Sequence, residues 1–236
     1  MKTTIIDKPK YWAIIPAAGI GQRMQSKISK QYIKINNQTI IERTVSLFST
    51  HPLIEKVIVV LHAEDTQWST LAIQSPEKVV TTVGGEERVD SVMQGLRYLQ
   101  TIAATNDWVL VHDAVRPCLA PSLLDFFIKT VADHRIGGLL AVPITDTIKK
   151  VDADHAVRAT ISREGLWTAQ TPQMFRYGFL FDAVQDALKL EIPITDESCA
   201  VELAGEHPLV VQGDWRNIKV TTPEDLDRAK YILSQV

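Results

Sequence analysis

The sequence predicts an α/β fold in which a Rossmann-like, mostly parallel and twisted sheet is flanked by helices. Three observations lead to this prediction. Strand-like and helix-like segments alternate from Tyr11 to Val142. Most helix-like segments have about ten residues or more, as a right-handed crossover between parallel strands requires. The strand-like segments are unbroken apolar runs, which are typical of strands buried on both faces of a sheet.

The elements of this first part follow one another in a regular order. Apolar runs rich in β-branched residues predict strands at 11–16, 57–61, 78–83, 108–112 and 138–142. The spacing of apolar residues predicts helices at 38–48, 65–73, 86–103 and 121–134. The helix over 86–103 has the clearest pattern, because Val92, Leu96 and Leu99 fall on one face.

The pattern changes after Pro143. Alternating residues over 144–161 predict a hairpin or arm instead of another crossover. Further elements are expected as helices at 176–188 and 196–203, the second capped by Thr195, and as strands at 209–211 and 217–220. The last helix opens with Thr222 and Pro223 in a near capping box. We therefore expect one domain over residues 1–236 that includes an inserted arm at about 144–162.

The composition excludes several classes of protein. The 236 residues include 25 basic and 28 acidic ones, so the formal net charge is −3, which argues against a nucleic-acid partner. Cys118 and Cys199 lie far apart without metal-ligand spacing, which fits a reducing compartment. No apolar run approaches the roughly 18 residues of a membrane span, and residues 1–10 lack the apolar stretch of a signal peptide. We expect a cytoplasmic protein with no membrane partner.

A glycine-containing loop follows the first predicted strand, with the sequence Pro16-Ala-Ala-Gly-Ile-Gly-Gln-Arg23-Met24. Its small residues allow backbone N–H groups to approach phosphate oxygens. A dinucleotide-binding fingerprint would need a third glycine where Met24 stands, and the Gly-Lys-Ser/Thr of a P-loop is absent. A plain tight turn followed by solvated basic residues is the alternative. The basic residues Arg23, Lys27 and Lys30 favour a clamp on a triphosphate.

In a mostly parallel sheet, ligands bind where the carboxyl ends of the strands meet the following loops. The loops over 16–29, 84–87 and 113–117 are therefore expected to gather at one site. Asp113 is the one acid at a strand end that can reach a metal ion or a substrate hydroxyl, although a role in capping the next turn is the alternative.

The ordered set of motifs resembles the 2-C-methyl-D-erythritol 4-phosphate cytidylyltransferase family of the non-mevalonate isoprenoid pathway. The resemblance covers nearly the whole chain, through motifs at 16–24, 30–32, 84–91, 112–117, 146–147, 163–167, 170–173, 195–197 and 217–221. It implies the nucleotide-diphospho-sugar transferase type of α/β fold with an extended β-arm. One departure is Ser29, where the family usually has proline.

The resemblance implies transfer of the cytidylyl group of CTP to a sugar-alcohol phosphate, with release of pyrophosphate. Arg23 and Lys30 would stabilise the transition state, and Arg163 and Lys219 would position the second substrate. The resemblance assigns the nucleotide to Pro16, Ala17, Ala18, Gly19, Gly85, Ser91 and Ala114. It assigns the second substrate to Asp113, Arg116, Thr147, Thr171 and Thr195.

The attacking group in this reaction is a phosphate monoester that is already largely ionised at neutral pH, so no general base is needed. The implied cofactor is Mg²⁺, bound mainly through the CTP phosphates and tentatively by Asp113. The family resemblance also implies a homodimer in which the arm, with Thr147 and Arg163, completes the partner's site.

Three alternatives remain open from the sequence. A ribitol-5-phosphate cytidylyltransferase shares most motifs, but usually has Leu-Ala-Gly-Gly in the first loop where this chain has Pro16-Ala-Ala-Gly19. A dinucleotide-dependent dehydrogenase is disfavoured by Met24. A non-catalytic nucleotide-binding protein is disfavoured by the intact basic residues Arg23, Lys30, Arg163 and Lys219.

Overall fold

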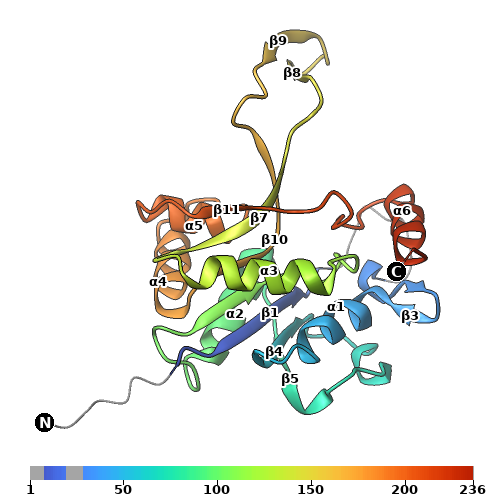
Figure 1. The fold of residues 1–236 in the computed structure, drawn as a ribbon, viewed down its shortest axis with the longest axis vertical. Helices are drawn as coiled ribbons and strands as arrows, with labels where there is room; N and C mark the ends of the chain where they lie inside the picture. Colours follow the sequence, from blue (N-terminus) through green and yellow to red (C-terminus); the bar gives the residue numbers. More distant parts are fainter. Residues whose placement is uncertain (1–7, 20–28, 236) are drawn as a thin grey trace, which may run out of the picture.

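The computed structural model describes residues 8–19 and 29–235 and is built around one seven-stranded sheet (Figure 1). In spatial order the strands are β11 (Leu209–Gln212), β7 (Gly137–Pro143), β10 (Trp167–Arg176), β6 (Trp108–Val111), β1 (Tyr11–Ala17), β4 (Ile54–Leu61) and β5 (Val79–Val83). All neighbouring pairs are parallel except those that β10 makes with β6 and β7. The predicted α/β class with a mostly parallel sheet is confirmed.

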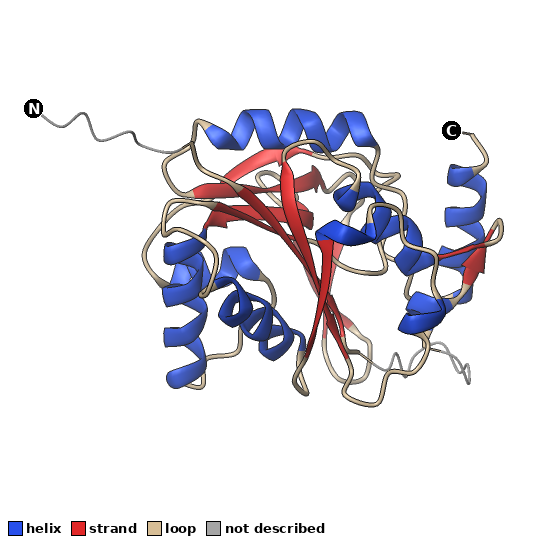
Figure 2. Ribbon diagram, turned by 90° about the horizontal axis from the view of Figure 1, so that it is seen from below, coloured by secondary structure: helices blue, strands red, loops and turns tan. Residues whose placement is uncertain are grey.

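Helices cover both faces of the sheet (Figure 2). One face packs against α1 (Ile40–Ser49) and α3 (Pro121–Ala132). The other packs against α2 (Arg88–Leu99), α4 (Tyr177–Lys189) and α5 (Glu197–Leu203). Successive residues of the buried strand β1 point to opposite faces and so belong to the two different cores. This double burial explains the unbroken apolar runs in the sequence.

A smaller cluster joins the last helix to the start of α1. Helix α6 (Pro223–Leu233) begins at the capping box of Thr222 and Asp225. Its Ala229 and Ile232 share this cluster with Ile35 and Ile40. Ile35 belongs to β2 (Lys34–Ile35), which pairs with β3 (Gln38–Thr39) just before α1. Within the described ranges, no helix has both the length and the apolar character needed to cross a membrane.

Strand β10 was not predicted from the sequence, because Pro172 interrupts it and polar residues (Gln170, Thr171 and Gln173) lie in its buried part. Proline cannot donate to a strand ladder and normally argues against a central strand. Here the register of β10 against β7 shifts between Ala169 and Gln173, which accommodates Pro172. The buried amides of Gln170 and Gln173 find partners at the Asp214 carbonyl and the Asp196 carboxylate.

Three other predicted elements differ in the structure. The helix expected over 65–73 is reduced to the 3-10 turn η3 (Trp68–Thr70), and the chain is already extended at Leu71. The Asp65 carboxylate accepts the N–H groups of Gln67 and Trp68 as a helix cap would, but no residue of η3 is buried, so packing does not stabilise a longer helix there. The strand expected over 217–220 is a loop. The cap of α5 is Asp196, which accepts the N–H of Cys199, and not Thr195. A further 3-10 turn, η4 (Pro76–Lys78), precedes β5.

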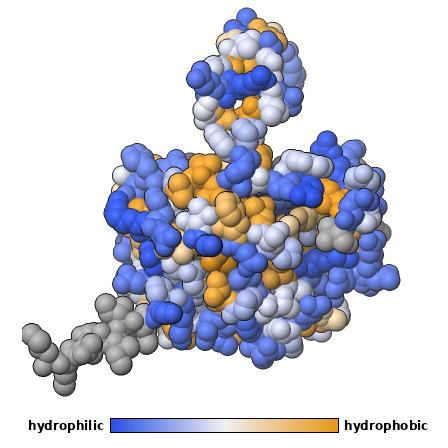
Figure 3. All heavy atoms as spheres, viewed as in Figure 1, coloured by the Kyte–Doolittle hydropathy of each residue, from blue (hydrophilic) through white to orange (hydrophobic). Residues whose placement is uncertain are grey.

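An arm leaves the sheet after β7 and returns as β10 (Figure 1). It contains the antiparallel pair β8 (Ile148–Val151) and β9 (Val157–Ile161). Every residue of β9 is exposed, including Val157 at 60%. The space-filling view shows the arm apart from the body, with apolar and polar atoms mixed on its surface (Figure 3).

Candidate active site

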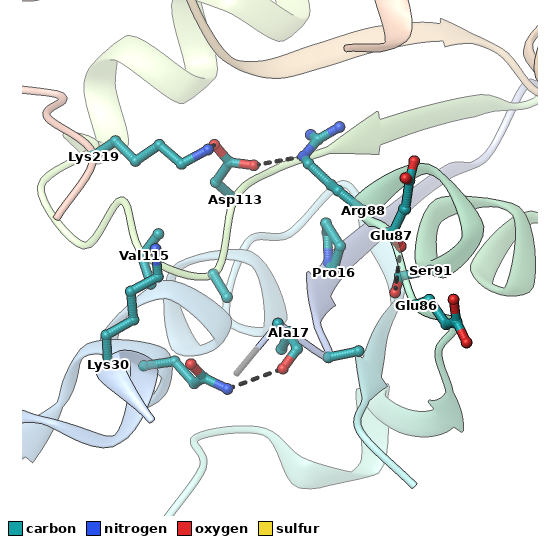
Figure 4. Close-up of a pocket in the computed structure, with 15 residues that line it drawn as sticks. Pro16, Ala17, Lys30, Glu86, Glu87, Arg88, Ser91, Asp113, Val115 and Lys219 are labelled. Atoms are coloured by element: carbon teal, nitrogen blue, oxygen red, sulfur yellow. Dashed lines mark hydrogen bonds and ion pairs between the residues drawn. The ribbon is translucent and has the colours of Figure 1, made fainter. Parts of the chain in front are cut away.

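A pocket of about 450 Å³ lies at the carboxyl ends of β1, β5 and β6 (Figure 4). Strand β1 has β4 on one side and β6 on the other, so the order of the strands reverses at β1. Ligands usually bind at such a switch point in parallel sheets. Its lining residues are Pro16, Ala17, Ala18, Gly19, Lys30, Gln31, Gly85, Glu86, Glu87, Arg88, Ser91, Asp113, Ala114, Val115 and Lys219. Segments that are far apart in the sequence therefore form one cavity.

The glycine pair after β5 allows the backbone to lie close to the first loop. A Cβ on Gly84 would lie 2.6 Å from both the Ala18 Cβ and the Ser91 Oγ. A Cβ on Gly85 would lie 2.4 Å from the Asp90 Cβ. Side chains at either position would push these segments apart. The wall of the pocket is therefore backbone at Gly85, which suits recognition of a flat ring by N–H and C=O groups.

Lys30 lies in the short 3-10 turn η2 (Lys30–Tyr32). The other two residues of this turn, Gln31 and Tyr32, are both held by side-chain hydrogen bonds. The buried Gln31 amide donates to the Ala17 carbonyl at 3.0 Å, tying the turn to the first loop. The Tyr32 hydroxyl donates to the Asp65 carboxylate at 2.6 Å. Burial and this carboxylate raise the pKa of Tyr32, so it remains a neutral donor. These two bonds fix the backbone that presents Lys30 to the pocket.

Asp113 is the electrostatic centre of the pocket. Its side chain is 8% exposed and contacts the Arg88 Nε and the Lys219 Nζ, each at 2.9 Å. Figure 4 shows Arg88 and Lys219 reaching it from opposite sides. The Arg116 Nε lies 3.5 Å from the same carboxylate. Burial alone would raise the pKa of Asp113, but the charges of Arg88, Lys219 and Arg116 hold it well below its usual range.

The backbone of Asp113 is held from behind by His112 and Thr171. The Asp113 N–H donates to the Thr171 Oγ1 at 3.1 Å. That hydroxyl lies 3.0 Å from the His112 Nδ1, and the His112 Nε2 lies 3.2 Å from the Arg116 carbonyl oxygen. Because a carbonyl only accepts, Nε2 carries the proton and Nδ1 accepts from Thr171. Burial lowers the pKa of His112 to about 4, which keeps the ring neutral.

The described residues do not fit a resident metal ion. Within 8–19 and 29–235, no group of three or more His, Cys, Asp or Glu side chains is arranged to hold one. Both oxygens of Asp113 already face basic side chains. A divalent cation placed there would meet three positive charges, so the tentative assignment of Asp113 as a metal ligand does not suit this arrangement.

Comparison with known proteins identifies the family. A family model described as "IspD: 2-C-methyl-D-erythritol 4-phosphate cytidylyltransferase" matches residues 11–235. The chain belongs to the IspD family. Curated 2-C-methyl-D-erythritol 4-phosphate cytidylyltransferases from Vibrio vulnificus and Pseudomonas aeruginosa are 45% and 46% identical to it, covering 94% and 95% of this chain and 94% and 97% of their own. The crystal structure of the Francisella tularensis IspD has a TM-score of 0.82 at 36% identity, covering 94% of this chain and 99% of that one.

Membership in the IspD family confirms the resemblance and removes the dehydrogenase alternative. The structure places most of the predicted site residues in the pocket: Pro16, Ala17, Ala18, Gly19, Lys30, Gly85, Ser91, Asp113, Ala114 and Lys219 all line it. Arg116 and Thr171 lie behind Asp113, where Arg116 also donates to the Asn217 carbonyl at 2.7 Å. Arg23 and Lys27 lie outside the described residues.

Three other predicted residues lie away from the IspD pocket of their own chain. Thr147 and Arg163 are exposed on the arm, where Arg163 donates to the Thr145 carbonyl. Thr195 is exposed just before α5, beside Glu197. The structure also shows two charged residues, Arg88 and Glu197, for which the sequence patterns predict no role. Arg88 lines the pocket and is bound by Glu197, a pairing across 109 positions that periodicity and spacing could not reveal.

Proposed function

We propose that this chain transfers the cytidylyl group of CTP to 2-C-methyl-D-erythritol 4-phosphate. The products are pyrophosphate and 4-diphosphocytidyl-2-C-methyl-D-erythritol, in the biosynthesis of isoprenoid precursors. The observation that supports this most strongly is a pocket with the family's motifs around it in a chain that matches the IspD model over residues 11–235.

The pocket suits a reaction that needs charge neutralisation and positioning instead of proton transfer. The phosphate of the second substrate attacks the α-phosphorus of CTP, and pyrophosphate leaves in line with it. The attacking oxygen is already ionised, so a general base is not required. Neutral His112 is buried and occupied by Thr171 and the Arg116 carbonyl, which leaves it as a support.

Basic side chains have separate roles in this proposal. Lys30 and Arg23 oppose the negative charge that grows on the α-phosphate. Lys219 receives the phosphate of the second substrate, and the partner's arm adds the Arg163 side chain. Lys219 suits this role because it is paired with Asp113 yet 40% exposed at the pocket, so a phosphate can reach it.

Mg²⁺ enters this proposal with the nucleotide. CTP phosphates supply oxygen ligands, and Mg²⁺ keeps several water molecules when it binds in this way. The chain's described residues offer no carboxylate cluster of their own, so its contribution is to receive the nucleotide–metal complex.

A homodimer with shared active sites is the second part of the proposal. The arm carries exposed apolar side chains at Val151, Val157 and Ile161, which water does not favour. Thr147 and Arg163 lie on the same arm, away from the pocket of their own chain. A second copy that accepts the arm would bury the apolar residues and complete the site in one step.

We propose a cytoplasmic location, in keeping with the free Cys118 and Cys199. The deciding experiment measures pyrophosphate release from CTP and Mg²⁺ with each sugar-alcohol phosphate in turn. Release is expected with 2-C-methyl-D-erythritol 4-phosphate and absent without a sugar phosphate. Release with ribitol 5-phosphate and not with 2-C-methyl-D-erythritol 4-phosphate would show that the proposed substrate is wrong. No release with either would favour a non-catalytic nucleotide-binding protein.

A further inference from the structure

All three guanidinium nitrogens of Arg88 donate hydrogen bonds to carboxylates. Arg88 stands at the start of α2 and lines the pocket. Its Nε donates to the Asp113 Oδ1 at 2.9 Å. Its Nη1 and Nη2 donate to the two Glu197 carboxylate oxygens at 2.6 and 3.1 Å. Such a fork fixes the plane of the guanidinium, which a single charge-to-charge contact would not do.

Hydrogen bonds to the central sheet hold the segment that carries Glu197. The Glu197 side chain is 3% exposed at the first turn of α5. The amide of Gln173 on β10 donates to the Asp196 cap at 2.8 Å and accepts the Ser198 N–H at 2.8 Å. The residues on both sides of Glu197 are therefore tied to the central sheet, and the direction of its carboxylate is set by the fold.

The fixed Arg88 determines how Asp113 is oriented. A carboxylate is planar, so holding Oδ1 against Arg88 determines where Oδ2 lies. The Lys219 Nζ rests 2.9 Å from that second oxygen. Lys219 itself is on a loop, and its side chain is 40% exposed. Its ammonium therefore takes its resting position from a chain of contacts that begins at Glu197.

We infer that Arg88 and Glu197 are positioning residues that orient Asp113 and thereby place the ammonium of Lys219 for the phosphate of the second substrate. This inference rests on the proposed function. The cluster contains three cations and two carboxylates, so it keeps one positive charge for an incoming phosphate. Without the fork, Arg88 and Lys219 would compete for Asp113 in several geometries.

The first test replaces Glu197→Gln, which keeps the shape of the side chain and removes its charge. The expected result is a loss of about 10- to 100-fold in kcat/KM for the sugar phosphate, the usual cost of a misplaced supporting contact. The KM for CTP should change by less than about twofold, because the glycine wall and first loop are untouched. Arg88→Lys should give the same split, because lysine keeps the charge but cannot form the fork.

A double-mutant cycle separates positioning from general damage to the fold. Glu197 reaches Lys219 through Arg88 and Asp113, so Glu197→Gln should lower kcat/KM no further when Lys219→Ala is already present. The matched control is Glu42→Gln, a buried carboxylate whose bonds go to Thr39 and the Ala72 N–H. It should lower the unfolding midpoint without changing the KM for the sugar phosphate.

The outcomes distinguish the inference from the proposed function. If the unaltered enzyme releases no pyrophosphate with either sugar phosphate, the proposed function fails. If it is active and Glu197→Gln and Arg88→Lys match it, the inference alone is wrong. Additive losses from Glu197→Gln and Lys219→Ala would also overturn it, as would equal rises in KM for both substrates.

Discussion

In the pocket, the Asp113 side chain is 8% exposed and lies between Arg88 and Lys219, whereas on the arm every residue of β9 is exposed. The first region is shaped by packing and ion pairs between segments far apart in the sequence. The second is a hairpin whose contacts are mainly with itself. The difference teaches that this IspD chain preorganises the charged cluster around Asp113 in its own pocket, while β8 and β9 of the arm pair mainly with each other. In the proposed dimer, the arm residues would act on the pocket of the partner.

The largest effect is expected from Asp113→Asn, which removes the anion at the centre of the pocket. Arg88, Lys219 and Arg116 would then repel one another without a counterion. Breaking a buried ion pair on one side costs about 3–5 kcal/mol of unfolding free energy. Urea denaturation measures this loss, with Asp154→Asn on the exposed arm as the control. Equal midpoints for the two variants would contradict the contrast between the regions.

The role of the arm can be tested by mixing subunits that carry different substitutions. Lys30→Ala and Arg163→Ala should each lower kcat by about 10²–10³, the usual cost of losing one preorganised charge in a transition state. If the arm serves the partner's pocket, mixed dimers regain one intact site, and total activity returns to about a quarter of the unaltered level. Pyrophosphate release measures the recovery.

The two variants must exchange subunits before the assay, which mass spectrometry of the mixture can establish. Mixed dimers that form without any recovered activity would place Arg163 in the site of its own chain. That result would remove the contrast between a preorganised pocket and an arm that serves a partner.

The third prediction concerns pH and the buried support of the pocket. The pKa of His112 is about 4 in the folded chain, below the roughly 6.5 of an unfolded histidine. The group therefore contributes stability that is present above pH 6.5 and is lost as the pH falls towards 4, by about 3 kcal/mol. His112→Asn should remove this part of the pH dependence.

The measurement is the free energy of unfolding in urea at intervals between pH 7 and pH 4. The variant and the unaltered protein should diverge at neutral pH and converge in acid. Parallel curves across this range would show that burial of His112 does not determine its protonation.

The smallest effect is expected from Val157→Ser on the arm. Val157 is 60% exposed, so the substitution should change the unfolding free energy by less than about 0.5 kcal/mol. Urea denaturation should be carried out at a dilution where the midpoint no longer depends on protein concentration. A loss of about 2 kcal/mol or more there would mean that Val157 is buried within its own chain, which contradicts the comparison.

The sequence predicted the parallel part of the fold well, because apolar periodicity and β-branched runs are local signals. It did not predict β10, since the polar Gln170 and Gln173 are stabilised by partners that only the folded chain provides. The helix expected over 65–73 is missing for a different reason: Asp65 caps the turn, but no residue of η3 is buried, so packing does not stabilise a longer helix.

The residues of the candidate site also divide into those that local sequence patterns predict and those that depend on contacts in the folded chain. Loops at strand ends were predictable, so Gly85, Asp113 and Ala114 were expected together and line one pocket. Arg88 and Glu197 had no predicted role, because a charged residue in the first turn of a helix usually faces water. Their fork depends on a contact between α2 and α5 that no spacing rule encodes.

The attachment of the arm has a consequence for engineering. Its two roots, Pro143 and Trp167, face each other in the β7–β10 ladder, and the Ile144 N–H donates to the Leu166 carbonyl at 3.0 Å just beyond them. The two ends of the arm are therefore adjacent on neighbouring strands of the central sheet. An arm from a relative can be grafted between these roots without altering the order of the strands. If the proposed dimer forms through the arm, such a graft would transfer the choice of partner from one enzyme to another.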